Sequence, residues 1–148
     1  MNKPLKAIAY LSASIGLVDS IYLTWIKLAN QEAYCAGIGD CEVVNTSRYS
    51  EIGGIPIALL GIGAYLAILI VLFLQDQDNV IGNNSSLILF AITLTGVLYS
   101  AYLTYVEIAV IYAICPFCVV SAIVMVILFV VTLVHMYGEG SRPSFAEE

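Results

Sequence analysis

Four long apolar segments constrain the fold of this chain more than any other feature of its sequence. They occupy about residues 7–28, 55–74, 87–112 and 116–136, and a helix needs about 20 residues to cross the hydrocarbon core of a bilayer. Unpaired backbone groups cannot face lipid, so segments of this kind are expected to be helices rather than strands. The sequence therefore predicts an all-α fold: a four-helix transmembrane bundle that forms a single domain over residues 1–148.

The composition agrees with a membrane protein and limits the kinds of partner. Hydrophobic residues make up 61% of the chain and charged residues 11%, whereas a soluble domain has roughly 25% charged residues. The net charge is −6, and the sequence has no basic cluster of the kind that binds nucleic acid or anionic lipid headgroups. We expect the lipid bilayer as the surroundings and no nucleic acid as a partner.

All four cysteines fall in connections on one side of the predicted bundle. Cys35 and Cys41 lie in the only long connection, residues 29–54, while Cys115 and Cys118 lie where the third and fourth helices join. The distribution of lysine and arginine favours cytoplasmic termini, and disulfides persist outside the cytoplasm. We therefore expect a multi-pass protein of the cell membrane with cytoplasmic termini, extracytoplasmic cysteines and a structured extracytoplasmic loop between helices one and two.

An internal repeat fits this layout. Residues 16–35 and 96–115 align without gaps, share Tyr-Leu-Thr and each end in a cysteine; a chance match between two apolar segments is the alternative. The first and third helices run the same way in a four-span bundle. Each would then deliver a cysteine to the same end of the molecule.

The repeat also relates the charged residues of the first and third spans. Glu107 aligns with Lys27, and we expect both near the outer interface, where their charges reach water. Asp19 aligns with Tyr99 and lies about midway along the first span, where an ionised carboxylate is costly. Three interpretations of Asp19 stay open: a proton relay, a helix-packing hydrogen bond, or a position that faces water.

Cys115 and Cys118 form a C-x-x-C motif at the start of the fourth helix. Pro116 suits the first helical turn, where its missing N–H would have no partner. A helix N-terminus stabilises a thiolate, so a cysteine there should have a lowered pKa and react readily. The motif lies at the membrane edge, where a lipid-soluble redox partner could reach it.

Cys35 and Cys41 form a second pair in a loop that contains Gly37 and Gly39. Such a loop can bend enough to bring two Cα atoms into disulfide range, and it is accessible to a soluble protein. The two pairs together indicate an electron relay by thiol–disulfide exchange. Two alternatives stay open: a non-catalytic membrane protein with structural disulfides, and a four-cysteine zinc site, for which the loop spacing is wider than the usual pattern.

The order of the two cysteine pairs, with the spaced pair first, resembles the vitamin K epoxide reductase family and its prokaryotic homologues. The resemblance covers nearly the whole chain. It includes Gly-Leu-Val-x-Ser-x-Tyr-Leu-Thr-Trp at 16–25, Ser47 six residues after Cys41, Gly-Gly-Ile-Pro at 53–56 and Cys-Pro-Phe-Cys at 115–118. The functionally similar DsbB family carries its two pairs in the reverse order.

The resemblance implies a quinone-dependent oxidoreductase that forms disulfides in proteins. Cys35 would exchange with a DsbA-like or other thioredoxin-fold protein, and Cys41 would pass electrons on to Cys115. Cys118 would face a quinone of the menaquinone or ubiquinone type. Many prokaryotic relatives are fused to a thioredoxin-like domain, but this chain ends soon after the fourth span, so the partner is expected to be a separate protein.

The resemblance also places three further residues at the quinone. Ser47 matches a family serine beside the loop cysteines, with a simple helix cap as the alternative. Asn45 stands where the animal enzymes carry a pocket phenylalanine, and Ala122 stands where they carry a quinone-contacting tyrosine. These departures favour plain quinone reduction over the alternative, a vitamin K quinone or epoxide reductase of the animal type.

Overall fold

Four long helices make up most of the described chain. The structure, a computed structural model, describes residues 1–31, 39–77 and 80–140, and of residues 42, 45, 139 and 140 only the backbone. The long helices are α1 (Lys3–Ala29), α3 (Ile57–Leu74), α5 (Ser85–Val106) and α6 (Pro116–Gly140). The shorter elements are α2 (Cys41–Thr46), a 3-10 turn (Arg48–Ser50), β1 (Glu51–Ile52), β2 (Ile55–Pro56), α4 (Val80–Asn83) and a π-helical turn (Glu107–Ile111).

The predicted four-helix transmembrane bundle is confirmed. Four segments are long and apolar enough to cross a membrane: Lys3–Ala29, Ile57–Leu74, Ser85–Ile111 and Pro116–Gly138. The third span runs through the π-helical turn, as expected from the apolar sequence that continues past Glu107. The first begins earlier than the apolar pattern indicates, because Pro4 is favourable in a first helical turn and extends the helix into a polar segment.

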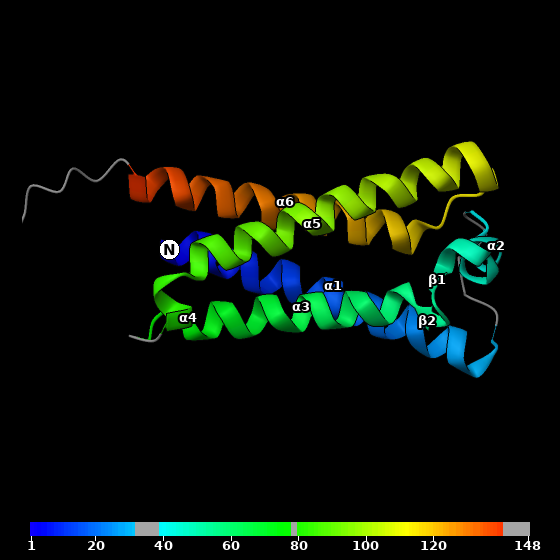
Figure 1. Cartoon of the computed structure of the whole chain (residues 1–148), viewed down its shortest axis with the longest axis horizontal. Helices are drawn as coiled ribbons and strands as arrows, with labels where there is room; N and C mark the ends of the chain where they lie inside the picture. The colour runs from blue at the N-terminus through cyan, green and yellow to red at the C-terminus, as the bar shows by residue number, and fades with distance from the viewer. Residues whose placement is uncertain (32–38, 78–79, 141–148) are drawn as a thin grey trace, which may run out of the picture.

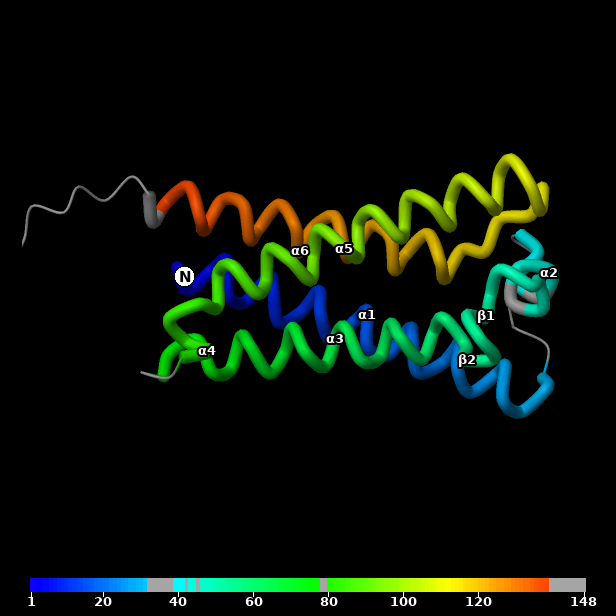
Figure 2. Tube along the Cα trace, viewed as in Figure 1, coloured from blue at the N-terminus to red at the C-terminus, as the bar shows by residue number. Residues whose placement is uncertain are grey.

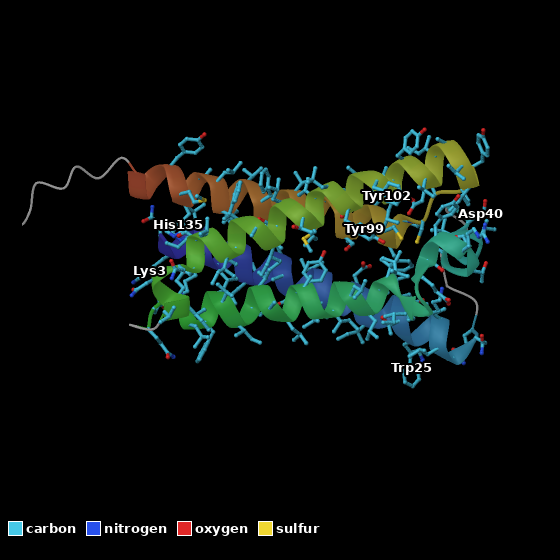
Figure 3. All side chains as sticks on the ribbon, in the orientation of Figure 1. Lys3, Trp25, Asp40, Tyr99, Tyr102 and His135 are labelled. Carbon is cyan, nitrogen blue, oxygen red and sulfur yellow. The ribbon has the colours of Figure 1, made fainter. Side chains whose placement is uncertain are left out.

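The helices alternate in direction, so their connections gather at two ends. The N-terminus, α4 and the end of α6 lie at one end, while α2, the β1–β2 hairpin and the start of α6 lie at the other (Figures 1 and 2). The labelled side chains follow the same division, with Lys3 and His135 at one end and Trp25 and Asp40 at the other (Figure 3). We call the second end the cysteine end, because Cys41 and Cys115 lie there.

Local backbone signals shape the cysteine end. α1 stops at Asn30 in the left-handed conformation (φ 49°), a common helix cap. Gly53 (φ 59°) and Gly54 (φ 85°) both have positive φ and form a tight turn that pairs β1 with β2. The π-helical turn ends at Tyr112, also left-handed (φ 55°). The loop after the first helix is therefore structured in its described part.

Small residues let the helices approach closely in the middle of the bundle. The ring of Tyr65 on α3 lies directly against Gly16 on α1, where any Cβ would clash with it. On the other side, Met125 of α6 lies against Gly96 of α5. Gly16 and Gly96 are equivalent positions of the repeat, and both serve the close packing that membrane helices obtain from small residues.

The outward faces of the long helices are apolar. Exposed side chains on them include Leu11, Val18, Ile70, Phe73, Leu98 and Ile123. Such continuous apolar surface would be unfavourable in water. It is the surface expected of a protein whose solvent is lipid, and this chain is a multi-pass membrane protein.

Candidate redox centre and cavity

The C-x-x-C motif opens α6 as the sequence predicts. The Val119 N–H donates to the Cys115 carbonyl (3.1 Å), which places Cys115 at the N-cap position, one residue before Pro116. Cys115 is buried, Cys118 is half-buried, and both are free thiols. A hydrogen bond from the Cys118 thiol lowers the pKa of Cys115. Of the two thiols, Cys115 is therefore the one whose deprotonation is favoured.

The carboxyl group of Glu107 contacts both cysteines of the C-x-x-C motif. Its Oε2 atom accepts a hydrogen bond from the Cys115 N–H (3.4 Å), and the Cys118 thiol lies within hydrogen-bond reach of the same carboxyl group. Glu107 is only 4% exposed, so the expectation that its charge reaches water was wrong. The physical reason is the π-helical turn, which begins at this residue and turns the carboxyl inward. Its repeat counterpart Lys27 instead forms a salt bridge with Glu51 (3.2 Å).

Cys41 lies beside the C-x-x-C motif. It is the first residue of α2, is 1% exposed and is disulfide-bonded. It shares a buried cluster with Val44, Ala113 and Cys115. The structure thus brings Cys41 next to Cys115, which is the contact that an electron relay requires. Cys35 lies outside the described residues, and its role stays a prediction.

The loop and the start of α6 are joined through their backbones. The Asp40 N–H donates to the Ile114 carbonyl (3.1 Å). Gly39 has φ 81°, and a Cβ at this position would clash with the same carbonyl oxygen. Glycine is therefore required here both for its backbone angle and for the close approach. The sequence suggested only that Gly39 bends the loop.

A cavity of about 680 Å³ lies between the helices, next to the redox pair. Its wall includes Cys115, Cys118 and Glu107, and it continues between α3 and α5, whose ribbons diverge toward the cysteine end (Figure 1). Most of the remaining wall is aliphatic, with Ile57, Leu60, Ile92 and Met125 among its side chains. This volume and character suit a small, largely apolar ligand.

The repeat-related helices α1 and α5 line the cavity with equivalent positions. Asp19 and Ser20 contribute from α1, and their counterparts Tyr99 and Ser100 contribute from α5. Both halves of the repeat therefore contribute residues to the cavity wall. This arrangement was not predicted, because the alignment relates sequences and does not say which side of each helix faces inward.

Of the three residues predicted to contact the quinone, Ser47, Ala122 and Asn45, only Ser47 is found in the cavity wall among the described side chains. Ser47 lines the cavity, and its hydroxyl also donates to the Val44 carbonyl (2.7 Å) at the end of α2, so both interpretations of this residue have a contact. Ala122 is half-buried and is not among the residues that line the cavity, whereas Ser121 is. The backbone of Asn45 lies in α2, but its side chain is outside the described part.

Sequence reasoning did not identify Glu107 or Tyr65 as part of the site. Tyr65 is completely buried, lines the cavity and places its hydroxyl 2.8 Å from that of Ser121 on α6. A tyrosine in an apolar span gives no signal of this role. Glu107 did carry a signal, since it is a charge at the end of a span eight residues before Cys115.

The comparison with known protein families agrees with this geometry. The chain matches the vitamin K epoxide reductase family over residues 7–133, which includes the four membrane spans up to the last turns of α6 and all four cysteines. Proteins of this family are membrane oxidoreductases associated with quinones. The chain belongs to the vitamin K epoxide reductase family.

Proposed function

We propose that this protein oxidises a thioredoxin-fold partner protein and passes two electrons to a quinone, and so supports disulfide bond formation in other proteins. One observation supports this most strongly. The free dithiol of Cys115 and Cys118 contacts the buried cluster of Cys41 and also lines the apolar cavity. The dithiol is therefore accessible to a thiol donor from one side and to a lipid-soluble acceptor from the other.

Electrons pass through two disulfide exchanges and one quinone reduction. In the first exchange the partner's dithiol becomes a disulfide, and the Cys35–Cys41 pair becomes a dithiol. The Cys41 thiolate then attacks Cys115 in the oxidised motif, which restores the loop disulfide and leaves the motif reduced. The dithiol finally gives two electrons and two protons to the quinone, which becomes the quinol, while the motif becomes a disulfide.

The described state corresponds to the step before quinone reduction. Cys41 is disulfide-bonded, and both cysteines of the motif are free. Cys115 is a member of the buried cluster that contains Cys41, whereas Cys118 packs against that cluster and is the more exposed of the two residues. We therefore assign exchange with the loop to Cys115 and contact with the quinone to Cys118.

Glu107 gives this step a base. The Cys118 thiol must lose its proton before its sulfur can donate electrons, and the Glu107 carboxyl is within hydrogen-bond reach of that thiol. The carboxylate accepts this proton and releases it toward the quinone side of the cavity, which Glu107 also lines.

The relay is tested by trapping its first intermediate. With Cys41→Ser, the mixed disulfide between Cys35 and a DsbA-like partner has no nearby thiolate to resolve it. We expect a higher-mass species on non-reducing gels that disappears with reductant. Cys35→Ser is the matched control and should form no adduct. Equal adducts in both variants would remove Cys35 from its assigned role, and cysteines that act only as structural disulfides would give none in either.

The quinone end is tested in the same preparation. Reduced Cys115→Ala protein, mixed with a menaquinone or ubiquinone analogue, should show a long-wavelength absorbance band from the Cys118 thiolate against the ring. Reduced Cys118→Ala protein should not. The opposite pattern would exchange the two roles, and no band in either variant would contradict contact between Cys118 and the quinone.

A further inference from the structure

Asp19 is a buried acid with an unused hydrogen-bonding atom. It lies in the middle of α1, is 8% exposed, and lines the same cavity as Cys118. Its Oδ2 atom is buried and has no hydrogen-bond partner among the described residues. Buried polar atoms are almost always paired, so an unpaired one in the wall of a cavity is a position where a bound molecule can form a hydrogen bond.

The surroundings of Asp19 do not supply a partner. Among the described residues that line the cavity, none is lysine, arginine or histidine, so no basic side chain in this wall can neutralise a carboxylate. The nearby Tyr65 hydroxyl lies 2.8 Å from the Ser121 hydroxyl and 3.2 Å from its carbonyl, and is thus already engaged with α6. A buried carboxyl that has neither a cation nor a hydrogen-bond donor beside it is most stable in its protonated form, which is itself a hydrogen-bond donor. Glu107 differs from Asp19 in this respect, because the Cys115 N–H and the Cys118 thiol both lie within hydrogen-bond reach of its carboxylate.

The contacts of Tyr65 show how deep Asp19 lies relative to Cys118. The Tyr65 ring lies against Gly16 on α1, and the Tyr65 hydroxyl lies against Ser121 on α6. Asp19 follows Gly16 by three residues and Cys118 precedes Ser121 by three, which puts each about 4.5 Å nearer the cysteine end at the helical rise of 1.5 Å per residue. Asp19 and Cys118 therefore line the cavity at about the same depth, from two different helices.

We propose that Asp19 is a catalytic residue of quinone reduction: its carboxyl group hydrogen-bonds a carbonyl oxygen of the quinone in this cavity and gives that oxygen a proton. This inference rests on the proposed quinone reductase function. A role in helix packing alone would pair both carboxyl oxygens with a neighbouring helix, which Oδ2 does not do. Water on the outer surface is also not its partner, since Asp19 is buried within the cavity wall.

The groups of the site account for both protons that quinone reduction requires. The dithiol loses two electrons and two protons as the Cys115–Cys118 disulfide forms. Asp19 gives its proton to one quinone oxygen, and the other oxygen takes a thiol proton by way of Glu107. The second thiol proton returns to Asp19 through the cavity. The net change is two thiols and a quinone converted to a disulfide and a quinol, with both carboxyl groups back in their starting states.

The test compares Asp19→Asn, Asp19→Glu and Asp19→Leu in purified full-length protein, with a menaquinone or ubiquinone analogue as acceptor. Asn keeps a polar group of the same shape but has no proton to transfer. We expect kcat to fall by roughly 100-fold while KM for the quinone changes little. Glu should recover part of kcat, and Leu should lose kcat and also raise KM. Asp76→Asn, which changes an exposed acid outside the cavity, should match the unmodified protein.

Two further measurements distinguish a failure of the Asp19 role from a failure of the proposed quinone reductase function. Reduction of the loop disulfide by a DsbA-like partner, followed by thiol alkylation, should be unchanged in Asp19→Asn, because that step does not involve the cavity. A variant that fails to fold would lose both reduction of the loop disulfide and reduction of the quinone. In that case the unmodified protein would be compared with Asp19→Glu instead. Unmodified kcat and KM in Asp19→Asn would overturn the role of Asp19 while leaving quinone reduction intact. If the unmodified protein reduces no quinone, the proposed function fails first.

Discussion

Glu107 contacts both cysteines of the C-x-x-C motif, through the Cys115 N–H and the Cys118 thiol. Its carboxylate and the Cys115 sulfur compete for the same Cys118 proton, because each is within hydrogen-bond reach of that thiol. Two negative charges side by side in a buried site are unfavourable. The protonation state of Glu107 and the ionisation of the Cys115 and Cys118 thiols therefore depend on one another.

Glu107→Gln should separate positioning from proton transfer. The amide oxygen of Gln can still accept the Cys115 N–H, but the side chain cannot take up the Cys118 proton. We expect quinone reduction by the pre-reduced motif to slow by roughly 100-fold, with little change in the free energy of unfolding. The measurement is single-turnover quinone reduction followed by absorbance.

Glu51→Gln is the control for this variant, since Glu51 is a half-exposed acid at the same end and forms a surface salt bridge with Lys27. Loss of this salt bridge should leave quinone reduction unchanged and lower the free energy of unfolding by at most about 1 kcal/mol. An equal loss of rate in both variants, or none in Glu107→Gln, would contradict the assignment of Glu107 as the base.

The residues of the site differ in how far the sequence revealed them. The C-x-x-C motif could be placed at a helix start, because Pro116 and the spacing of Cys115 and Cys118 have a local physical meaning. The burial of Glu107 could not be predicted, because it depends on a π-helical turn, and no local pattern distinguishes that turn from an ordinary helix end. Tyr65 was hidden for another reason: its contacts with Gly16 and Ser121 join three different helices.

At the scale of elements, the contact between the loop and the start of α6 holds Cys41 beside the C-x-x-C motif. It consists of the Asp40 to Ile114 backbone hydrogen bond and the close approach of Gly39 to the same carbonyl. Both lie directly beside Cys41 and Cys115 in the sequence. The position of α2 relative to α6 therefore sets how readily the loop can reach the motif.

Gly39→Ala should loosen this contact. Alanine is strained at φ 81°, and its Cβ would clash with the Ile114 carbonyl, so we expect a loss of roughly 1–3 kcal/mol in the free energy of unfolding. Electron transfer from a DsbA-like partner to the quinone should slow, because Cys41 is displaced from Cys115. Quinone reduction by a motif that has been reduced before the assay should continue.

Gly63→Ala is the matched control, because Gly63 is an exposed helical glycine of α3 with open space where its Cβ would be. This change should be neutral or stabilise the helix by up to about 1 kcal/mol. Wild-type transfer through the loop in Gly39→Ala would show that the loop reaches the motif without this contact.

The elements themselves could largely be predicted, since a run of about 20 apolar residues has few other folds in lipid. The interior of the loop could not. α2 is only six residues long, and β1 and β2 have two residues each, so neither carries a full period of hydrophobic pattern. These elements form because they pack against the bundle, for example through the buried cluster that Cys41 and Val44 share with Ala113 and Cys115.

At the scale of the whole molecule, the bundle has one chemically active end. The cysteine end carries Cys41, Cys115 and Glu107, while the N-terminus, α4 and the end of α6 lie at the opposite end (Figure 1). A membrane that encloses this bundle must place the two ends in different compartments. The proposed function requires the cysteine end to face the extracytoplasmic side, where disulfides persist.

This orientation can be measured with single reporter cysteines in a variant whose four native cysteines are serine. Glu51→Cys marks the cysteine end and Asp76→Cys marks the other; both side chains are exposed. An impermeant maleimide applied to intact cells should label the first reporter. The second should react only after the cells are permeabilised. The reverse pattern would invert the predicted orientation and place the proposed reaction in the cytoplasm.

The burial of Cys41 and Cys115, each 1% exposed, has a consequence for selectivity. Small thiols dissolved in water cannot readily attack a sulfur that solvent does not reach. In the proposed relay, electrons from the partner protein would therefore pass through two sulfurs that a soluble reductant such as glutathione does not readily reach. Burial of this kind would keep the protein selective for its partner in a compartment that contains both oxidants and reductants.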